Sequence, residues 1–259
     1  DNIHVERGRI FESLGDTEQA LHEFNRALEM NPENLNAYNG RASLFETLED
    51  LPAAIAEYTN AILIDPQIAQ AYLGRGTAYQ QLGETEKALA DYKSAIELDP
   101  ELTRAYGNRA RLYTEDRELG DPIADFSAVI ELEPDNASAY FGRGNIYFDN
   151  AEYGKALADF SQALKLEPGL GAAYSNRARI YTDRQDYAAA LADYSAVIEL
   201  EPENAAAHDS RGVVYATVND PDSAMADFAR ALELDPSLAP RKNKVAMLQP
   251  LQTSPRPLS

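Results

Sequence analysis

Residues 69–102 read AQAYLGRGTAYQQLGETEKALADYKSAIELDPEL, and the same chemistry returns when the sequence is shifted by 34 residues in either direction. A lattice of seven prolines has this period: Pro32, Pro66, Pro100, Pro134, Pro168, Pro202 and Pro236. The lattice fixes the register, so residues in different repeats can be compared column by column. The chain is therefore predicted to be an array of tandem repeats.

Each repeat is predicted to form two amphipathic helices. In residues 69–102, two runs of apolar side chains at helical spacing flank Gly83. Gly83 suits the left-handed residue that ends a first helix, and Pro100 cannot continue the second. Because a helical hairpin of this length cannot bury its apolar faces alone, the repeats are expected to stack on one another.

Three columns of the repeat point to a family. One holds only small residues, which let two helix backbones approach: Gly8, Ala42, Gly76, Ala110, Gly144, Ala178 and Gly212. Two hold only aromatic residues: Phe11, Phe45, Tyr79, Tyr113, Tyr147, Tyr181 and Tyr215, then Phe24, Tyr58, Tyr92, Phe126, Phe160, Tyr194 and Phe228. With the second-helix alanines and the closing proline, this pattern resembles the tetratricopeptide repeat. Tyrosine stands in that family's tryptophan column and arginine in its leucine column.

The resemblance implies an all-α fold, a right-handed superhelical solenoid of tandem helix-turn-helix repeats. Seven repeats are expected, at 1–34, 35–68, 69–102, 103–136, 137–170, 171–204 and 205–238. Residues 239–259 form a basic, proline-rich tail, in which Val245, Met247 and Leu248 are compatible with a short capping helix at 241–248.

Repeat four keeps its length but has its turn residues several positions late. Asp121 is predicted to cap the second helix, and Pro122 to occupy its first position. The first helix or the inter-helix loop, whose turn contains Gly120 and Asp121, should therefore be about a turn longer, and the second helix correspondingly shorter.

Composition excludes several classes of protein. The chain has 43 acidic and 23 basic residues and a net charge of −20. Such a surface repels nucleic acid and anionic membranes, so no nucleic-acid partner is predicted. No apolar segment is long enough for direct membrane insertion. Without cysteine there is no disulfide framework, and both a cytoplasmic and a periplasmic or extracellular location are compatible. Asp1 already lies inside a first-helix pattern, so further residues are expected upstream.

No catalytic, metal or cofactor site is predicted. The sequence has no glycine-rich phosphate loop, no nucleophile with an accompanying histidine, and three scattered histidines. His4 and His208 replace a packing tyrosine in the first and last repeats and are expected to be half-exposed core residues. The protein is therefore predicted to be non-catalytic.

Two columns are charged in every repeat. The first is Arg7, Arg41, Arg75, Arg109, Arg143, Arg177 and Arg211; the second is Glu23, Glu57, Asp91, Asp125, Asp159, Asp193 and Asp227. Both flank the packed face, which favours a ladder of Arg-carboxylate pairs. The alternative, an anion-binding ladder of arginines, would require those side chains to be free.

The resemblance implies a concave groove lined by the outer faces of the first helices. Its peptide-binding residues are expected to be Leu73, Thr77, Arg104, Asn108, Arg111, Phe141, Asn145, Phe148, Asn176, Arg179 and Val213. Arginine, asparagine and aromatic side chains suit an extended peptide, so the predicted partner is a protein or peptide ligand that is acidic or carboxylate-bearing. Ordinary solvated helix positions are the alternative reading.

One binding site known in relatives is only partly matched by this sequence. Asn145 and Asn176 match the asparagines of a carboxylate clamp found in some relatives. However, Phe141, Ala206 and Ser210 stand at its cationic positions, so the clamp is not reproduced.

The alternative function is a self-assembling scaffold, in which array ends or the tail contact a neighbouring copy. The basic tail would then seek acids such as Glu46, Glu115, Asp149 and Asp183.

Overall fold

The computed structural model describes residues 1–241, with side chains described as far as Leu238. These residues form fourteen α-helices and a 3-10 helix, without a strand. The elements are α1 (Asn2–Ser13), α2 (Thr17–Met30), α3 (Leu35–Thr47), α4 (Leu51–Ile64), α5 (Ala69–Gln81), α6 (Thr85–Leu98), α7 (Thr103–Glu115), α8 (Pro122–Leu132), α9 (Ala137–Asp149), α10 (Tyr153–Leu166), α11 (Gly171–Asp183), α12 (Tyr187–Leu200), α13 (Ala205–Thr217), α14 (Pro221–Leu234) and η1 (Pro236–Arg241). The predictions for the rest of the tail, including the capping helix, lie outside the described residues.

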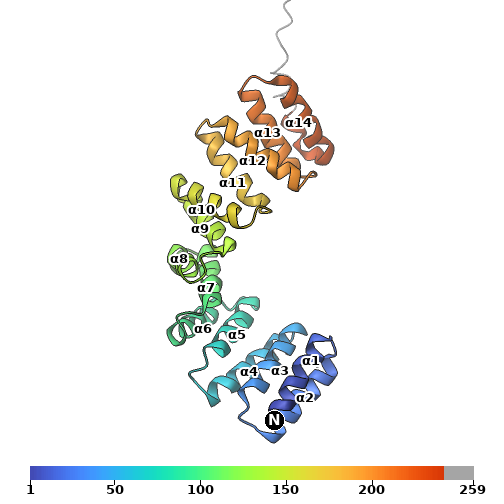
Figure 1. Ribbon diagram of the computed structural model, residues 1–259, viewed down its shortest axis with the longest axis vertical. Coiled ribbons are helices and arrows are strands. Elements are labelled where there is room, and N and C mark those ends of the chain that lie inside the picture. Colours follow the sequence, from blue (N-terminus) through green and yellow to red (C-terminus); the bar gives the residue numbers. More distant parts are fainter. Residues whose placement is uncertain (242–259) are drawn as a thin grey trace, which may run out of the picture. The chain divides into compact units, whose positions relative to one another are not determined.

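Consecutive helices form pairs, one pair in each 34-residue repeat. The two helices of a pair lie side by side, as α1 and α2 or α13 and α14 do in Figure 1. The chain divides into two compact units, Asp1–Pro134 and Asp135–Ser259. Within each unit the second helix of one repeat also packs on the first helix of the next, as α4 does on α5 and α12 on α13. Tandem helix pairs of this kind confirm the predicted all-α solenoid class.

A left-handed residue closes the turn between the two helices of most repeats. Gly83 has a φ of 76°, as predicted for the residue that ends the first helix. Five other repeats have a left-handed residue in this column: Gly15, Glu49, Ala151, Gln185 and Asn219. Four aspartates in the next column cap the second helix by accepting a hydrogen bond from the N–H three residues on: Asp16, Asp50, Asp186 and Asp220. Local sequence thus fixes where these helices begin.

The aromatic column of the second helices forms the centre of the core. Phe24 and Phe160 are fully buried, and the neighbouring alanines of the same helices pack against them. A Cβ added at Gly8 would lie 2.6 Å from Cε1 of Phe24, and one at Gly144 would lie 2.9 Å from Cδ1 of Phe160. These small residues therefore let the first helix approach the ring closely, as predicted.

Repeat four departs from the others between its two helices. α7 has the same 13 residues as most first helices, but α8 has 11 residues where the other second helices have 14. Asp121 caps α8 through its side chain and Pro122 lies in the first turn, which confirms the displaced helix start. Because α7 is not extended, the additional residues lie in the loop, where a Cβ on Gly120 would lie 2.4 Å from the Tyr113 ring.

Candidate binding surface

One arginine of each first helix forms an ion pair with a carboxylate of the second helix in the same repeat. N···O distances of 2.6–2.8 Å separate the pairs Arg7–Glu23, Arg41–Glu57, Arg75–Asp91, Arg109–Asp125, Arg143–Asp159, Arg177–Asp193 and Arg211–Asp227. In the five repeats with aspartate, Nε and Nη2 donate to the two carboxylate oxygens. The predicted ladder is therefore confirmed in all seven repeats.

Aromatic rings and the preceding repeat hold the same arginines in place. The guanidinium carbon of Arg75 lies 5.7 Å from the ring centroid of Tyr72 and 6.0 Å from that of Tyr79. Its Nη1 donates to Thr59 Oγ1 of the preceding repeat at 3.2 Å. The hydrogen bond with Asp91 raises the pKa of Arg75, and burial acts in the opposite direction. This column joins the repeats and leaves no row of free guanidiniums for an anion-binding ladder.

The two terminal histidines contribute to the ladder. His4 Nδ1 lies 2.6 Å from Glu23 Oε2, and His208 Nδ1 lies 3.1 Å from Asp227 Oδ1. The expectation of a half-exposed side chain is wrong for His208, which is 7% exposed, because the carboxylate gives the buried imidazole a hydrogen-bond partner. Over the part of the chain that the structure describes, no group of three or more His, Cys, Asp or Glu residues could hold a metal ion.

In the first unit, the predicted groove residues separate into buried and accessible ones. Leu73 is 2% exposed and belongs to a buried cluster that also contains Leu112 of α7, so little of its side chain is accessible. Asn108 Nδ2 donates to Thr77 Oγ1 at 3.3 Å, and Arg111 Nη2 donates to Asn108 Oδ1 at 2.8 Å. The structure thus brings Thr77, Asn108 and the exposed Arg111 together across α5 and α7.

In the second unit, five predicted groove residues lie on neighbouring first helices: Phe141, Asn145 and Phe148 on α9, Asn176 and Arg179 on α11. Asn176 Nδ2 donates to Asn145 Oδ1 at 2.8 Å. The guanidinium carbon of Arg179 lies 4.7 Å from the ring centroid of Phe148. Phe141 instead packs its ring on the buried Phe160, 6.0 Å between centroids. Val213 lies on α13, and no described contact joins its side chain to this cluster.

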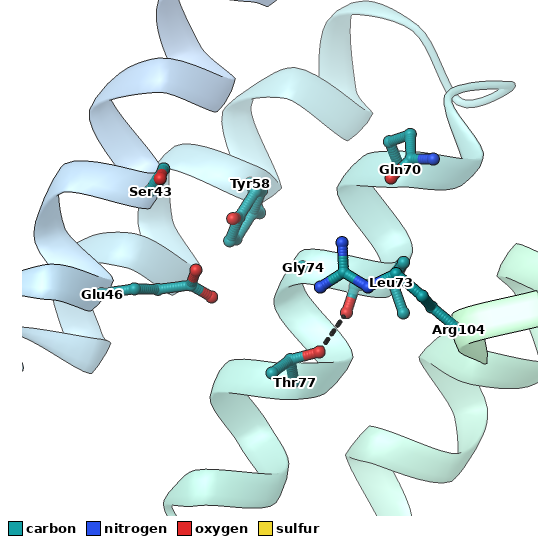
Figure 2. Close-up of a pocket in the computed structure, with 8 residues that line it drawn as sticks. All are labelled: Ser43, Glu46, Tyr58, Gln70, Leu73, Gly74, Thr77 and Arg104. Atoms are coloured by element: carbon teal, nitrogen blue, oxygen red, sulfur yellow. Dashed lines mark hydrogen bonds between the residues drawn. The ribbon is translucent and has the colours of Figure 1, made fainter. Parts of the chain in front are cut away.

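A cavity of about 210 Å³ in the first unit was not predicted from the sequence. Its lining residues come from α3, α4, α5 and α7: Ser43, Glu46, Tyr58, Gln70, Leu73, Gly74, Thr77 and Arg104. Figure 2 shows the carboxylate of Glu46 and the guanidinium of Arg104 reaching toward the cavity from opposite sides, with the Tyr58 ring between α3 and α5. Of the predicted groove residues, the cavity brings Arg104 together with Thr77 and the buried Leu73.

The Glu46 carboxylate is incompletely satisfied in this cavity. Its Oε1 atom is buried and has no hydrogen-bond partner. Burial raises the pKa of Glu46, while a hydrogen bond with the Tyr58 hydroxyl and the charge of Arg104 act to lower it. Among the described residues, Arg104 acts on Glu46 through its charge and does not donate a hydrogen bond to Oε1. The ionised carboxylate therefore lacks part of the solvation that it would have in water.

A sequence signal for this cavity existed in the aromatic column of the second helices. Tyr58, Tyr92 and Tyr194 carry a hydroxyl where the other four repeats have phenylalanine. Tyr92 Oη donates to Gln80 Oε1 at 2.6 Å, and Gln80 stands in the same column as Glu46. Because a buried tyrosine hydroxyl needs a partner, a polar residue twelve positions before the tyrosine marks the place where a polar cavity can open.

Replacing Glu46 with glutamine should change how stability depends on pH. Since the folded-state pKa of Glu46 is raised, the folded protein keeps this proton at pH values where the unfolded chain has lost it. This group therefore lowers stability as pH rises through the two pKa values. We expect the free energy of unfolding of Glu46→Gln, relative to that of the unsubstituted protein, to increase from pH 4 to pH 7.

Urea titrations monitored by far-UV circular dichroism at several pH values measure this difference. Glu49→Gln is the matched control, because Glu49 is exposed and lies three residues further along the chain. A difference that stays constant with pH, or one equal to that of the control, would contradict a raised Glu46 pKa.

Family profiles described as tetratricopeptide repeat match residues 5–71, 69–102, 137–170 and 205–238, and one described as TPR repeat matches residues 178–218. None of these ranges contains repeat four, whose loop departs from the pattern. With the fold and the regular 34-residue spacing of the ladder, these matches establish the class: the chain belongs to the tetratricopeptide repeat family. No curated protein matches the chain.

Solved structures share the fold. YrrB, described as a TPR protein with an unusual peptide-binding site, is 23% identical over 72% of this chain and 97% of its own, with a TM-score of 0.64. MamA is 23% identical over 66% and 94%, with a TM-score of 0.61. The C-terminal part of a TPR repeat-containing protein from Cytophaga hutchinsonii is 19% identical over 95% and 100%, with a TM-score of 0.74. Across residues 1–241, no helix is long and apolar enough to cross a membrane.

Proposed function

We propose that this protein is a non-catalytic scaffold that binds an extended peptide or a partner helix on the first helices of its repeats. The observation that carries the proposal is the Phe148–Arg179 pair: a half-buried ring under a cation, beside the bonded amides of Asn145 and Asn176. The ion pairs of the ladder use a different column of arginines, so Arg179 is not needed for them. Aromatic and arginine anchors of this kind usually dominate interface energies.

The ligand is an acidic or carboxylate-bearing segment. Arg111 donates to an amide oxygen and Arg179 lies over an aromatic ring, so each guanidinium keeps donors for a ligand carboxylate. Both side chains are exposed. A charge-assisted contact at such a site contributes to affinity and is weakened by salt. The peptide-binding description of YrrB supports a groove role in this fold.

A display library of linear peptides selected on the full chain supplies the probe for this function. We expect selected peptides to be acidic and to lose affinity as salt rises. Arg111→Ala should weaken selected peptides that bind the first unit, and Phe148→Ala those that bind the second, each about tenfold or more, as expected for loss of one interface anchor. Calorimetry or fluorescence anisotropy measures the dissociation constants.

Glu131→Ala is the control, because Glu131 is exposed on a second helix, α8. Its affinity should stay within about twofold of the unsubstituted protein, which corresponds to a few tenths of a kcal/mol. Equal affinities for the three variants would remove the first-helix surface as the binding site.

A further inference from the structure

We propose that the cavity around Glu46 is a subsite for the basic side chain of a bound peptide, a lysine or an arginine. The inference rests on the proposed function, because it assumes that a peptide lies along the first helices of this unit. The groove arginines predict an acidic ligand. The cavity predicts, in addition, that this ligand carries one cationic side chain.

The buried Oε1 of Glu46 lacks a hydrogen-bond donor, and two hydroxyls that line the cavity donate elsewhere. Ser43 Oγ donates to Glu12 Oε1 at 2.9 Å, and Thr77 Oγ1 donates to the carbonyl of Leu73 at 2.9 Å. A buried acceptor without a partner is costly, whereas the exposed Arg104 remains solvated when no ligand is present. The Glu46 carboxylate therefore lacks a hydrogen-bond donor, and a cationic donor forms the strongest hydrogen bond with a carboxylate.

The surroundings also favour a cation. Residues 1–134, the first unit, contain 26 acidic and 11 basic side chains. A cavity of about 210 Å³ is large enough for one long side chain and too small for a folded element. Lysine and arginine also place an aliphatic stem behind the charge, which can lie against the apolar edge formed by Leu73 and Gly74.

Arg104 then has a positioning role on the rim. Its guanidinium reaches toward the cavity from the side opposite Glu46, and the two groups are not paired with each other (Figure 2). A peptide backbone carbonyl can accept from Arg104 while the side chain of the same residue reaches Glu46. Thr77 lines the cavity and is bonded to Asn108, which is bonded to Arg111, so an acid in the same segment can reach Arg111.

Gly74 lets the cavity exist in this form. A Cβ at Gly74 would lie 2.3 Å from Cζ of Tyr58, so any other residue would push the ring away from its place next to Glu46. The glycine therefore leaves room for the Tyr58 ring beside Glu46 in the cavity wall.

Three capped tripeptides test the proposal on the full chain: acetyl-Gly-Lys-Gly-amide, the same peptide with norleucine, and the same peptide with glutamate. Titrations are followed by chemical-shift changes of backbone amides in ¹H–¹⁵N spectra. We expect the lysine peptide to shift amides of cavity-lining residues with millimolar affinity, and the norleucine peptide to bind at least about tenfold more weakly, since only the ammonium differs.

Glu46→Gln should reduce the affinity for the lysine peptide about tenfold or more, while Glu49→Gln, which removes the same charge outside the cavity, should change it by less than about twofold. Spectra of each free variant verify that it is folded. Equal binding of the lysine and norleucine peptides, equal effects of the two variants, or cavity shifts caused by the glutamate peptide would each overturn the proposal.

The outcomes separate this subsite from the proposed function. Peptides selected on the full chain that respond to Phe148→Ala and Arg111→Ala but not to Glu46→Gln would disprove the subsite and leave the scaffold function standing. Tripeptide binding that depends on Glu46 would support the subsite. If the affinities of the selected peptides are also unchanged by Phe148→Ala and Arg111→Ala, the wider groove would be rejected.

Discussion

Phe160→Ala is expected to destabilise the protein by about 3–5 kcal/mol, the range observed when a large aromatic side chain is removed from a core. Phe160 is fully buried, and its ring contacts the Phe141 ring with centroids 6.0 Å apart. It also fills the space opposite Gly144, where no side chain is present to close the resulting cavity. Because each repeat is stabilised by its neighbours, the loss should lower the urea midpoint of the transition that includes this repeat.

Phe148→Ala is the matched control for this substitution. It removes the same ring from a half-buried position on α9, so it should cost at most about 1 kcal/mol of unfolding free energy. The stability measurement is also a control for the binding experiment, in which Phe148→Ala must lower affinity without unfolding the chain. If Phe148→Ala is as costly as Phe160→Ala, the ring belongs to the core, and its role in binding would be contradicted.

Arg109→Ala is expected to cost about 3 kcal/mol, because it leaves the buried carboxylate of Asp125 without its partner. The Asp125 side chain is 6% exposed and accepts from Arg109 at 2.7 and 2.8 Å. The guanidinium carbon also lies 5.8 Å from the ring centroids of Tyr106 and Tyr113, so packing is lost together with the charge. Urea unfolding monitored by circular dichroism gives the change in free energy.

Arg26→Ala tests whether burial is the cause. Arg26 pairs with Glu29 at 2.8 Å, a distance similar to that of the ladder, but the side chains are 52% and 61% exposed. An exposed pair contributes little, so this variant should lose less than about 0.5 kcal/mol. Removing both charges of the ladder pair, with Arg109→Met and Asp125→Leu, should cost less than Arg109→Ala alone. Similar losses for Arg109→Ala and Arg26→Ala would show that the ladder does not stabilise the fold.

The periodic sequence determined the fold class and the pairing of charges by itself. Seven copies of each column report the same environment, so a residue type that recurs in all of them, such as the arginine of the ladder, must satisfy a contact made within every repeat. Local chemistry was also sufficient for the late start of α8, because Asp121 and Pro122 act on the backbone of their own helix.

Only the tertiary structure decided which of the varying residues are accessible and which side chains meet. Leu73 stands in a first-helix column that also holds the half-buried Phe141, yet Leu73 is 2% exposed and belongs to a buried cluster with Leu112 of the next repeat. The cavity is lined by three successive repeats, with Glu46 and Tyr58 in repeat two, Gly74 in repeat three and Arg104 in repeat four, so no single repeat contains it. Contacts between neighbouring repeats depend on the size and reach of non-repeating side chains, and a period of 34 residues carries no information about them.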